Sequence, residues 1–295
     1  MSKFRLKSPA RRVFYFLYSE RGEEFALPVA NRHLVYPVCP FCVFAVERFK
    51  IKSMIILFTD FSVRDPYVGQ VKGVLHQHAP GVPQIDLLHE VPAFNVRGGA
   101  HLLAALERQF QPGGVFLAVV DPGVGSERDA VVMAADGKWF VGPDNGLFSV
   151  IAARADQPKF WRIHWRPRKL SHTFHGRDLF APIAALIAKG AFPHDKVEEI
   201  PALNAQSGAQ DLDEIIYIDH YGNAMTGFRA KSLTFNHQLL VHGGRLRRAT
   251  IYAEVHGGTP FWYENCVGLA EIAIGSGNAA QELDLEIGDK IELVG

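Results

Sequence analysis

Several features are scarce or missing in this sequence, and each excludes a class of protein. The 295 residues include only three cysteines (Cys39, Cys42 and Cys266), too few for a disulfide framework, which favours a reducing, cytoplasmic compartment. The 31 basic and 31 acidic residues balance, so the chain carries no electrostatic footprint for nucleic acid or an anionic membrane. No apolar run approaches the roughly 20 residues that span a bilayer.

Common catalytic and binding fingerprints are missing as well. No G-x-G-x-x-G follows a predicted strand, no P-loop is present, and no G-x-S-x-G elbow marks a serine hydrolase. There is no H-E-x-x-H and no paired C-x-x-C, so we predict no metal site. The chain is 48% hydrophobic and long enough for one large domain or two ordinary domains with a real core.

Residues 1–53 differ in composition from the rest of the chain. Basic residues precede a short segment, VFYFLYS, which is too short and too polar for a signal peptide. Cys39 and Cys42 have the redox spacing C-x-x-C without a strand–helix context, and a lone pair is a poor zinc site. We expect residues 1–53 to be an extension outside the functional core. Because Met54 begins a clean strand, translation from Met54 is an alternative start.

Residues 54–204 alternate between strand and helix patterns. Short apolar runs at 54–59 and 116–120 are typical of buried strands, residues 84–88 are a further predicted strand, and the segments 67–78 and 95–110 between them have helical spacing. This alternation is typical of βαβ units. It predicts an α/β N-terminal domain, with a parallel-rich sheet and helices on both faces.

Local signals add detail to this domain. Asp65 before Pro66 is expected to cap the first helix, and Asn95 is expected to cap the second. Asp136-Gly137 predicts a two-residue hairpin turn. Helices are also expected at 147–155 and 179–188. Pro182 either kinks the last helix or marks its true first turn.

After Pro201 the pattern changes. Residues 202–210 are polar and small, as in a linker, and residues 211–295 contain short strand-like runs without a convincing helix. The runs are 215–218, 239–242, 250–255, 269–274 and 290–294. They predict a smaller all-β C-terminal domain, either a barrel or a sandwich.

The stretch Phe116–Arg128, FLAVVDPGVGSER, joins a buried strand to charged groups. Pro122 cannot continue a strand ladder, and the glycines that follow allow a tight turn and close approach to a ligand. Asp121 and Arg128 are thus delivered to the carboxyl end of a strand, where open α/β sheets bind ligands. The alternative is a plain Asp-Pro-Gly turn with an exposed arginine.

Two further residues in the first domain can carry chemistry. The two oxygens of Asp60, after the first strand, can accept hydrogen bonds from a vicinal diol, or Asp60 serves only the turn. His175 lies in a Gly-flanked turn before a helix, where a histidine is either a structural hydrogen-bonder or a catalyst. Since the chain has 13 histidines, any single histidine is a weak signal of function. Asp178 is most simply a helix-start residue favoured by the helix dipole.

Several motifs that are weak singly occur together in one order. The chain resembles the family of adenosine-forming S-adenosylmethionine hydrolases, which is related to the fluorinase and chlorinase enzymes. The resemblance runs from about Met54 to Gly295. It rests on TDF with D-x-YVG-x-x-KG (59–73), VDPGVG-x-x-R (120–128), GPDNG (142–146), TFHGRD-x-FAP (173–182), D-x-x-GN (219–223) and N-x-x-G-x-x-EIA (265–273).

The resemblance implies an α/β N-terminal domain, residues 54–204, and a barrel-like β C-terminal domain, residues 211–295. It implies a homotrimer whose active sites lie between the N-terminal domain of one subunit and the C-terminal domain of the next. S-adenosyl-L-methionine is the implied substrate, and no cofactor is expected.

The resemblance also implies roles for residues. The hydrolytic set falls on Asp121, Arg128 and His175, and the carboxylate for the ribose hydroxyls falls on Asp60. The other implied substrate contacts are Asp65, Asp219, Asn265 and Cys266 around the methionine end, Asn223 at the adenine, and Tyr252 as an aromatic that stacks on the base.

The residue types suit this chemistry. The sulfonium makes the ribose 5′ carbon an electrophile, and methionine leaves as a neutral thioether, so no general acid is needed. We expect Asp121 and His175 to orient and deprotonate a water molecule while Arg128 holds the developing hydroxide charge. Positioning the water in line with the 5′ carbon supplies much of the rest of the rate.

Three residues depart from the usual family pattern. Ser62 stands where glycine is usual, Gly227 where asparagine is usual, and Cys266 where serine is usual. A thiol is a weaker hydrogen-bond partner for a carboxylate than a hydroxyl is. Cys266 is alternatively a buried small residue. Two rivals stay open beside an unrelated function: a halogenase of the same superfamily, against which charged Arg128 and His175 argue, and a sensor that binds S-adenosylmethionine without turnover.

Overall fold

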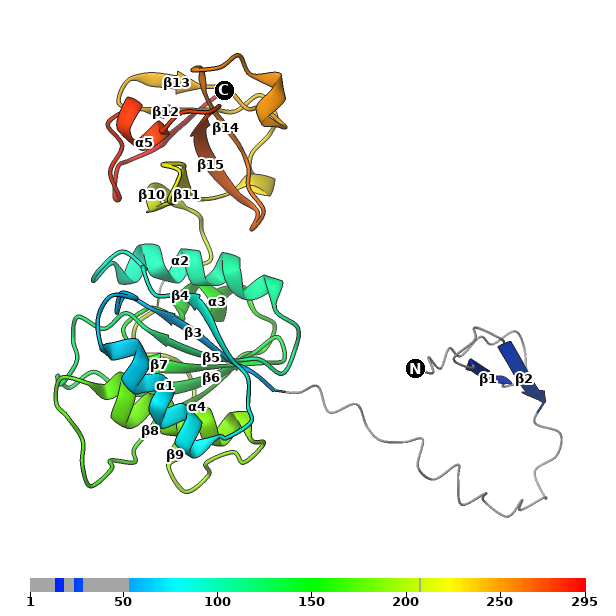
Figure 1. Cartoon of the computed structure of the whole chain (residues 1–295), viewed down its shortest axis with the longest axis vertical. Coiled ribbons are helices and arrows are strands. Elements are labelled where there is room, and N and C mark those ends of the chain that lie inside the picture. The colour runs from blue at the N-terminus through cyan, green and yellow to red at the C-terminus, as the bar shows by residue number, and fades with distance from the viewer. Residues whose placement is uncertain (1–13, 19–23, 29–52, 207) are drawn as a thin grey trace. The chain divides into compact units, whose positions relative to one another are not determined.

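The computed structural model describes residues 14–18, 24–28, 53–206 and 208–295 (Figure 1). The chain divides into two compact units, Met1–Lys50 and Ile51–Gly295. In the first unit, β1 (Phe14–Tyr18) pairs antiparallel with β2 (Glu24–Pro28). The interpretation of Cys39 and Cys42, and most of the interpretation of residues 1–53, lies outside the described residues.

A seven-stranded sheet forms the centre of the α/β domain, in the order β4-β3-β5-β7-β6-β8-β9. The pairs β4–β3, β3–β5 and β5–β7 are parallel, and the pairs β7–β6, β6–β8 and β8–β9 are antiparallel. The strands are β3 (Ile55–Thr59), β4 (Gln84–Leu88), β5 (Val115–Val119), β6 (Ala130–Ala135), β7 (Lys138–Pro143), β8 (Lys159–Ile163) and β9 (Val197–Ile200). The sheet is therefore mixed, with its parallel half formed by the predicted βαβ segments.

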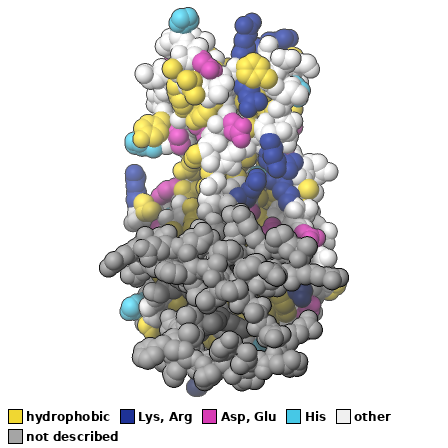
Figure 2. Space-filling model, turned by 90° about the vertical axis from the view of Figure 1, so that its right-hand side faces the viewer, with side chains coloured by type: hydrophobic (Ala, Val, Ile, Leu, Met, Phe, Trp, Pro, Cys, Tyr) yellow, Lys and Arg dark blue, Asp and Glu magenta, His cyan; other side chains and the backbone are white. Residues whose placement is uncertain are grey.

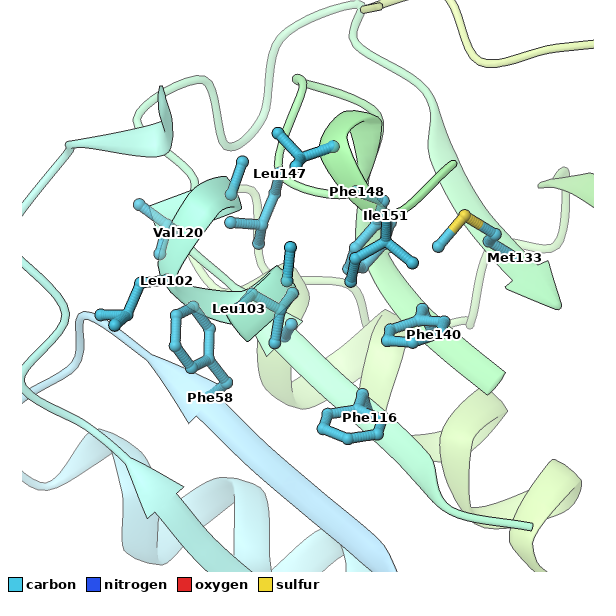
Figure 3. Packing of buried hydrophobic residues seen from close by; sticks show 14 of the residues in the cluster. Phe58, Leu102, Leu103, Phe116, Val120, Met133, Phe140, Leu147, Phe148 and Ile151 are labelled. Carbon is cyan, nitrogen blue, oxygen red and sulfur yellow. The ribbon is translucent and has the colours of Figure 1, made fainter. Parts of the chain in front are cut away.

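Helices cover both faces of this sheet, as predicted. Alternate side chains of β3 enter different cores: Ile56 and Phe58 pack with α2 and α3, while Ile55 and Leu57 pack with α1 and α4. The helices are α1 (Tyr67–His78), α2 (Val96–Leu106), α3 (Ser149–Arg154) and α4 (Ala181–Ala188). In the first core, the rings of Phe116 and Phe140 stack with centroids 5.0 Å apart (Figure 3).

Of the two helix caps predicted in this domain, one forms and the other does not. Asn95 caps α2 by accepting a hydrogen bond from the Gly98 amide. The prediction that Asp65 caps α1 is wrong, because the helix begins one residue later, with Pro66 at the cap position and no side-chain cap. Pro182 lies in the first turn of α4, and the expected helix at 147–155 shrinks to α3.

The C-terminal domain consists of two antiparallel sheets with one shared core, not a single closed barrel. The four-stranded sheet has the order β10-β11-β15-β14 and the three-stranded sheet the order β13-β12-β16. The strands are β10 (Leu212–Ile218), β11 (Ala224–Arg229), β12 (Gln238–Val241), β13 (Gly244–Leu246), β14 (Pro260–Glu264), β15 (Leu269–Ile274) and β16 (Glu292–Val294). Ile215, Leu239 and Trp262 are buried in the core between them.

Two expectations for this domain were wrong. The segment 250–255 is not a strand: it forms a 3-10 turn at Tyr252–Glu254, because the Glu254 carboxylate accepts the Thr250 amide and closes the loop. A single helical turn, α5 (Ala279–Glu282), also interrupts the strands.

The surface of the β domain mixes side chains of different kinds. On the face that Figure 2 shows, hydrophobic side chains lie among lysine, arginine, aspartate and glutamate side chains. The exposed hydrophobic residues of this domain include Tyr221, Phe235 and Ile251. Among the described residues, no helix has the length and apolarity that a membrane crossing requires.

Candidate active site

The carboxyl ends of β3 and β5 open into a cavity of about 320 Å³. Asp60 follows β3 and Asp121 follows β5, so two carboxylates reach the same edge of the parallel sheet. Asp65, from the segment before α1, and His175, before α4, also line the cavity. Four of the ten residues predicted as site residues thus meet in one cavity.

Arg128 lies beside this cavity and joins two of its residues. Its guanidinium donates to both carboxylate oxygens of Asp121, with Nε 2.9 Å from Oδ1. The same guanidinium lies 3.0 Å from Nδ1 of His175. Because a guanidinium only donates, Nδ1 must accept this hydrogen bond, and the proton of the neutral imidazole is then on Nε2. Arg128 thus joins Asp121 and His175 into one hydrogen-bonded cluster.

The environment keeps His175 neutral. Its ring is buried, and this burial, together with the positive charge of Arg128, lowers the pKa of His175 below its ordinary value of 6.5. The guanidinium also lies over the Phe180 ring, 5.3 Å from its centroid. Phe180 belongs to a π-helical turn, Gly176–Phe180, that precedes α4. Sequence reasoning missed this aromatic contact, although FAP in the matched motif contains the residue.

The loop between Asp121 and Arg128 folds back on itself. The amide and hydroxyl of Ser126 both donate to the Gly123 carbonyl, and the Arg128 amide donates to the Ser126 hydroxyl. Gly125 has φ +82°, and a Cβ there would lie 2.5 Å from the His172 carbonyl oxygen. This position therefore requires glycine, which lets the loop pass close to the segment that carries His175.

The GPDNG motif supports the end of β5. The Asn145 side chain donates to the Val120 carbonyl at 2.8 Å, next to Asp121. Asp144 accepts the amides of Asn204 and Ala205 and so ties the linker to this turn. Burial raises the pKa of Asp144. The motif thus positions Asp121 without entering the cavity.

The Asp60 carboxylate accepts a hydrogen bond from a residue with an unusual backbone conformation, Phe94, beside the cavity. Its Oδ2 accepts the Phe94 amide at 3.1 Å, while Oδ1 has no hydrogen-bond partner within residues 53–206 and 208–295. Burial, and to a smaller degree the charge of Asp121, raise the pKa of Asp60. Phe94 has φ +63° and a 72% exposed side chain, a strained conformation typical of functional sites.

The predicted site residues of the C-terminal domain do not line this cavity. Asp219 accepts the amides of Tyr221 and Asn223, and the Asn223 side chain also donates to it, so these residues form one turn between β10 and β11. Asn265 and Cys266 lie on the turn between β14 and β15 and line a second cavity of about 330 Å³. Tyr252 is 41% exposed on its 3-10 turn.

The structure shows the surroundings of the three residues that depart from the usual family pattern, Ser62, Gly227 and Cys266. Cys266 is exposed, so the alternative of a buried small residue is wrong. Ser62 adopts φ +61°, the left-handed region that favours glycine. A Cβ on Gly227 would lie 2.4 Å from Cβ of Leu212, so close packing of β11 on β10 requires glycine here. Among the described residues, no three or more His, Cys, Asp or Glu side chains are grouped so that they could hold a metal ion.

Fold and site together define a two-domain protein, with an Asp-Arg-His cluster at the carboxyl edge of an α/β sheet. Two family models match the chain: the SAM hydroxide adenosyltransferase N-terminal domain over residues 55–198 and the corresponding C-terminal domain over residues 213–292. The chain belongs to the SAM hydroxide adenosyltransferase family.

Individual relatives agree with this assignment. A protein of Thermus thermophilus named (R)-S-adenosyl-L-methionine hydrolase is 36% identical over 81% of this chain and 99% of its own length. A fluorinase of Nocardia brasiliensis is more distant, 24% identical over 62% of this chain and 73% of its own. The crystal structure of an uncharacterised conserved protein from Thermotoga maritima superposes with a TM-score of 0.74, at 31% identity, over 82% of this chain and all of that one.

Proposed function

We propose that this chain hydrolyses S-adenosyl-L-methionine to adenosine and L-methionine by attack of water on the ribose 5′ carbon. The observation that carries the proposal is the contact of Asp121, Arg128 and His175 beside the cavity at the end of β5. The name of the Thermus thermophilus relative, which this chain matches over nearly its whole length, supports the same reaction.

The geometry divides the chemical roles. An ionised carboxylate has more lone pairs than the two that Arg128 occupies, so Asp121 can accept a proton from the attacking water. His175 accepts a hydrogen bond from Arg128 at Nδ1, so its proton is on Nε2. The Nε2–H group orients the attacking water by donating a hydrogen bond to the water oxygen. Arg128 stabilises the developing hydroxide. Since methionine leaves as a neutral thioether, the site needs no general acid.

Asp60 and Asp65 bind the substrate in the same cavity. The free Oδ1 of Asp60 accepts from a ribose hydroxyl while Oδ2 stays on the Phe94 amide. Asp65 is exposed and carries no capping hydrogen bond, so its carboxylate is available for the ammonium group of the methionine end.

The remaining substrate contacts come from a neighbouring subunit of a homotrimer: Asp219, Asn223, Tyr252, Asn265 and Cys266. Two observations support this arrangement. None of these residues lines the cavity with Asp60 and Asp121. The mouth of that cavity also carries exposed aromatic side chains, Phe94 at 72% and Tyr67 at 45%, which a second subunit can cover.

The active unit consists of domains 54–204 and 211–295, and residues 1–53 take no part in turnover. A chain that starts at Met54 should therefore keep the kcat/KM of the full chain. A large loss of kcat/KM in that shortened chain, with its oligomeric state unchanged, would contradict this assignment.

The reaction is tested by incubating the full chain with S-adenosyl-L-methionine in ¹⁸O-labelled water, without metal or halide. Chromatography with mass detection should find adenosine and methionine in equal amounts, with the label at the adenosine 5′ oxygen. Bound ligand without product after long incubation would mean a sensor instead. Formation of 5′-chloroadenosine only when chloride is added would mean a halogenase.

A further inference from the structure

Glu271 is a buried acid in the middle of an apolar strand. It belongs to β15, Leu269–Ile274, whose residues are all buried, and Glu271 itself is 2% exposed. Burying a carboxylate costs several kcal/mol unless hydrogen bonds satisfy it. The contacts of this carboxylate therefore indicate why the strand tolerates it.

Both oxygens of Glu271 accept hydrogen bonds from residues near the predicted substrate contacts. Tyr263, its cross-strand partner on β14, donates through its hydroxyl to Oε1. The Asn265 side-chain amide donates to Oε2 at 2.8 Å. The Tyr252 hydroxyl donates in turn to the Tyr263 hydroxyl at 3.1 Å. One continuous network thus joins Tyr252 to Asn265.

The network also fixes which way the Asn265 amide points. Backbone amides only donate, so Oδ1 must face the amides of the turn and the side-chain nitrogen must face Glu271. There Oδ1 accepts the amides of Val267 and Leu269, at 3.1 and 2.9 Å. These bonds shape the turn that carries Cys266. Loss of the carboxylate would leave the Asn265 amide and the Tyr263 hydroxyl without their acceptor.

We infer that Glu271 and Tyr263 are positioning residues that hold the Tyr252 ring and the Asn265–Gly268 turn in one fixed arrangement. This inference rests on the proposed function, in which Tyr252 stacks on adenine and the turn binds the methionine end. Glu271 serves both ends of the substrate, and Tyr263 serves the adenine end only. Neither residue touches the reacting atoms, so both act on affinity and not on the chemical step.

The consequences of the inference differ between two conservative variants. Tyr263→Phe removes one hydroxyl and keeps the ring, so KM for S-adenosyl-L-methionine should rise about fivefold, while kcat stays within about twofold. The inhibition constant of adenosine should rise by the same factor, and that of L-methionine should not change. Glu271→Gln replaces one accepting carboxylate oxygen with an NH₂ group, which donates and cannot accept the hydrogen bonds of the network. The inhibition constants of adenosine and of L-methionine should therefore both rise about tenfold.

Thr226→Val is the matched control, because it removes a different buried hydrogen bond to β15, from the Thr226 hydroxyl to the Ala270 carbonyl at 2.8 Å. It should lower Tm as the other variants do and leave KM unchanged. A similar rise of KM in Thr226→Val would mean general destabilisation and overturn the inference. An unchanged KM in Tyr263→Phe would overturn it too, even if Glu271→Gln fails to fold.

The wild-type chain, measured in parallel, separates this inference from the proposed function. If it releases no adenosine, the hydrolase proposal fails, and calorimetric binding of S-adenosyl-L-methionine replaces KM as the readout. Weaker binding by Tyr263→Phe than by wild type and Thr226→Val would then still support the positioning role. Equal binding by all three, or no binding by wild type, would overturn it.

Discussion

The catalytic residues of the α/β domain differ in exposure from two of the contacts assigned to the β domain, Tyr252 and Cys266. In the α/β domain, the side chains of Asp121 and Arg128 are only 5% and 10% exposed and hold each other through two hydrogen bonds. In the β domain, Tyr252 and Cys266 lie exposed on turns. The groups assigned to the chemistry are thus fixed within one chain, whereas Tyr252 and Cys266 are exposed where a second subunit can contact them.

Replacing Arg128, one of the fixed groups of the α/β domain, should have the largest effect on activity. Arg128→Ala should lower kcat by at least about 100-fold, because the developing hydroxide loses its positive partner and Asp121 loses its ion pair. Calorimetric affinity for S-adenosyl-L-methionine should change little. Arg162→Ala, which breaks a half-exposed pair with Glu198, is the control and should keep full turnover. Near-normal kcat in Arg128→Ala would remove Arg128 from the mechanism.

Asp60 tests binding on the α/β side of the site. Asp60→Asn keeps an oxygen for the Phe94 amide but removes the negative charge from the ribose site. A hydrogen bond to a charged group contributes about 1.5–3 kcal/mol, so KM should rise roughly 10- to 100-fold. Steady-state kinetics with Asp195→Asn, an exposed surface site, as control would measure it. An effect confined to kcat would place Asp60 in the chemistry instead.

The pH dependence tests the neutral state of His175. Its pKa is lowered by burial and by Arg128, so the neutral imidazole predominates at pH 6.5 and above. Below its folded pKa, protonation removes the Nδ1 acceptor, and kcat/KM should fall about tenfold per pH unit. His175→Asn should abolish this acidic limb. A limb centred above pH 6.5 would contradict the assigned environment.

The lowered pKa of His175 also makes the free energy of unfolding depend on pH. Because the folded state binds the His175 proton more weakly than the unfolded state, the free energy of unfolding falls as pH drops below 6.5. Buried His101, whose pKa burial lowers to about 4, adds about 3 kcal/mol to this loss between pH 6.5 and 4. Chemical denaturation of His101→Leu should show a correspondingly flatter pH profile. An unchanged profile would mean that His101 titrates normally.

The smallest expected effect concerns backbone strain beside the cavity. Ser62 adopts φ +61°, so Ser62→Gly should relieve about 1 kcal/mol of strain. The lost hydrogen bond from the Ser62 hydroxyl to Glu90 is exposed and offsets only part of this gain. Denaturant titration should show a small increase in stability with kcat and KM unchanged. A decrease would mean that the Glu90 contact outweighs the strain.

Much of the α/β domain was predictable because its signals are local. Apolar runs located β3 and β5, and an Asp-Pro-Gly turn whose aspartate lies seven residues before an arginine placed Asp121 near Arg128. The β domain was harder. The segment around Tyr252 alternates like a strand, but the Glu254 carboxylate closes it into a turn. Strand β11 was missed because Gly227, which β10 requires at close approach, looks like a break in a strand.

Glu271 was missed for a related reason. A single acid inside an apolar run shows only that the strand has a special neighbour, and the partners Tyr263 and Asn265 become visible only when β14 and β15 pair. Likewise, no sequence pattern tells whether the predicted contacts of the two domains meet within one chain. The structure places Asp60 and Asp121 around one cavity and Asn265 and Cys266 around another.

The claim that the two halves of each site come from different copies has a direct test. Arg128→Ala destroys the chemical half and keeps the recognition half, and the double variant Tyr252→Ala, Asn265→Ala does the reverse. Each variant alone should be nearly inactive. When the two are unfolded together and refolded as mixed oligomers, part of the wild-type turnover of S-adenosyl-L-methionine should return, because some sites combine two intact halves. If mixed oligomers form and no turnover returns, both halves belong to one chain, and the division of each site between two subunits is wrong.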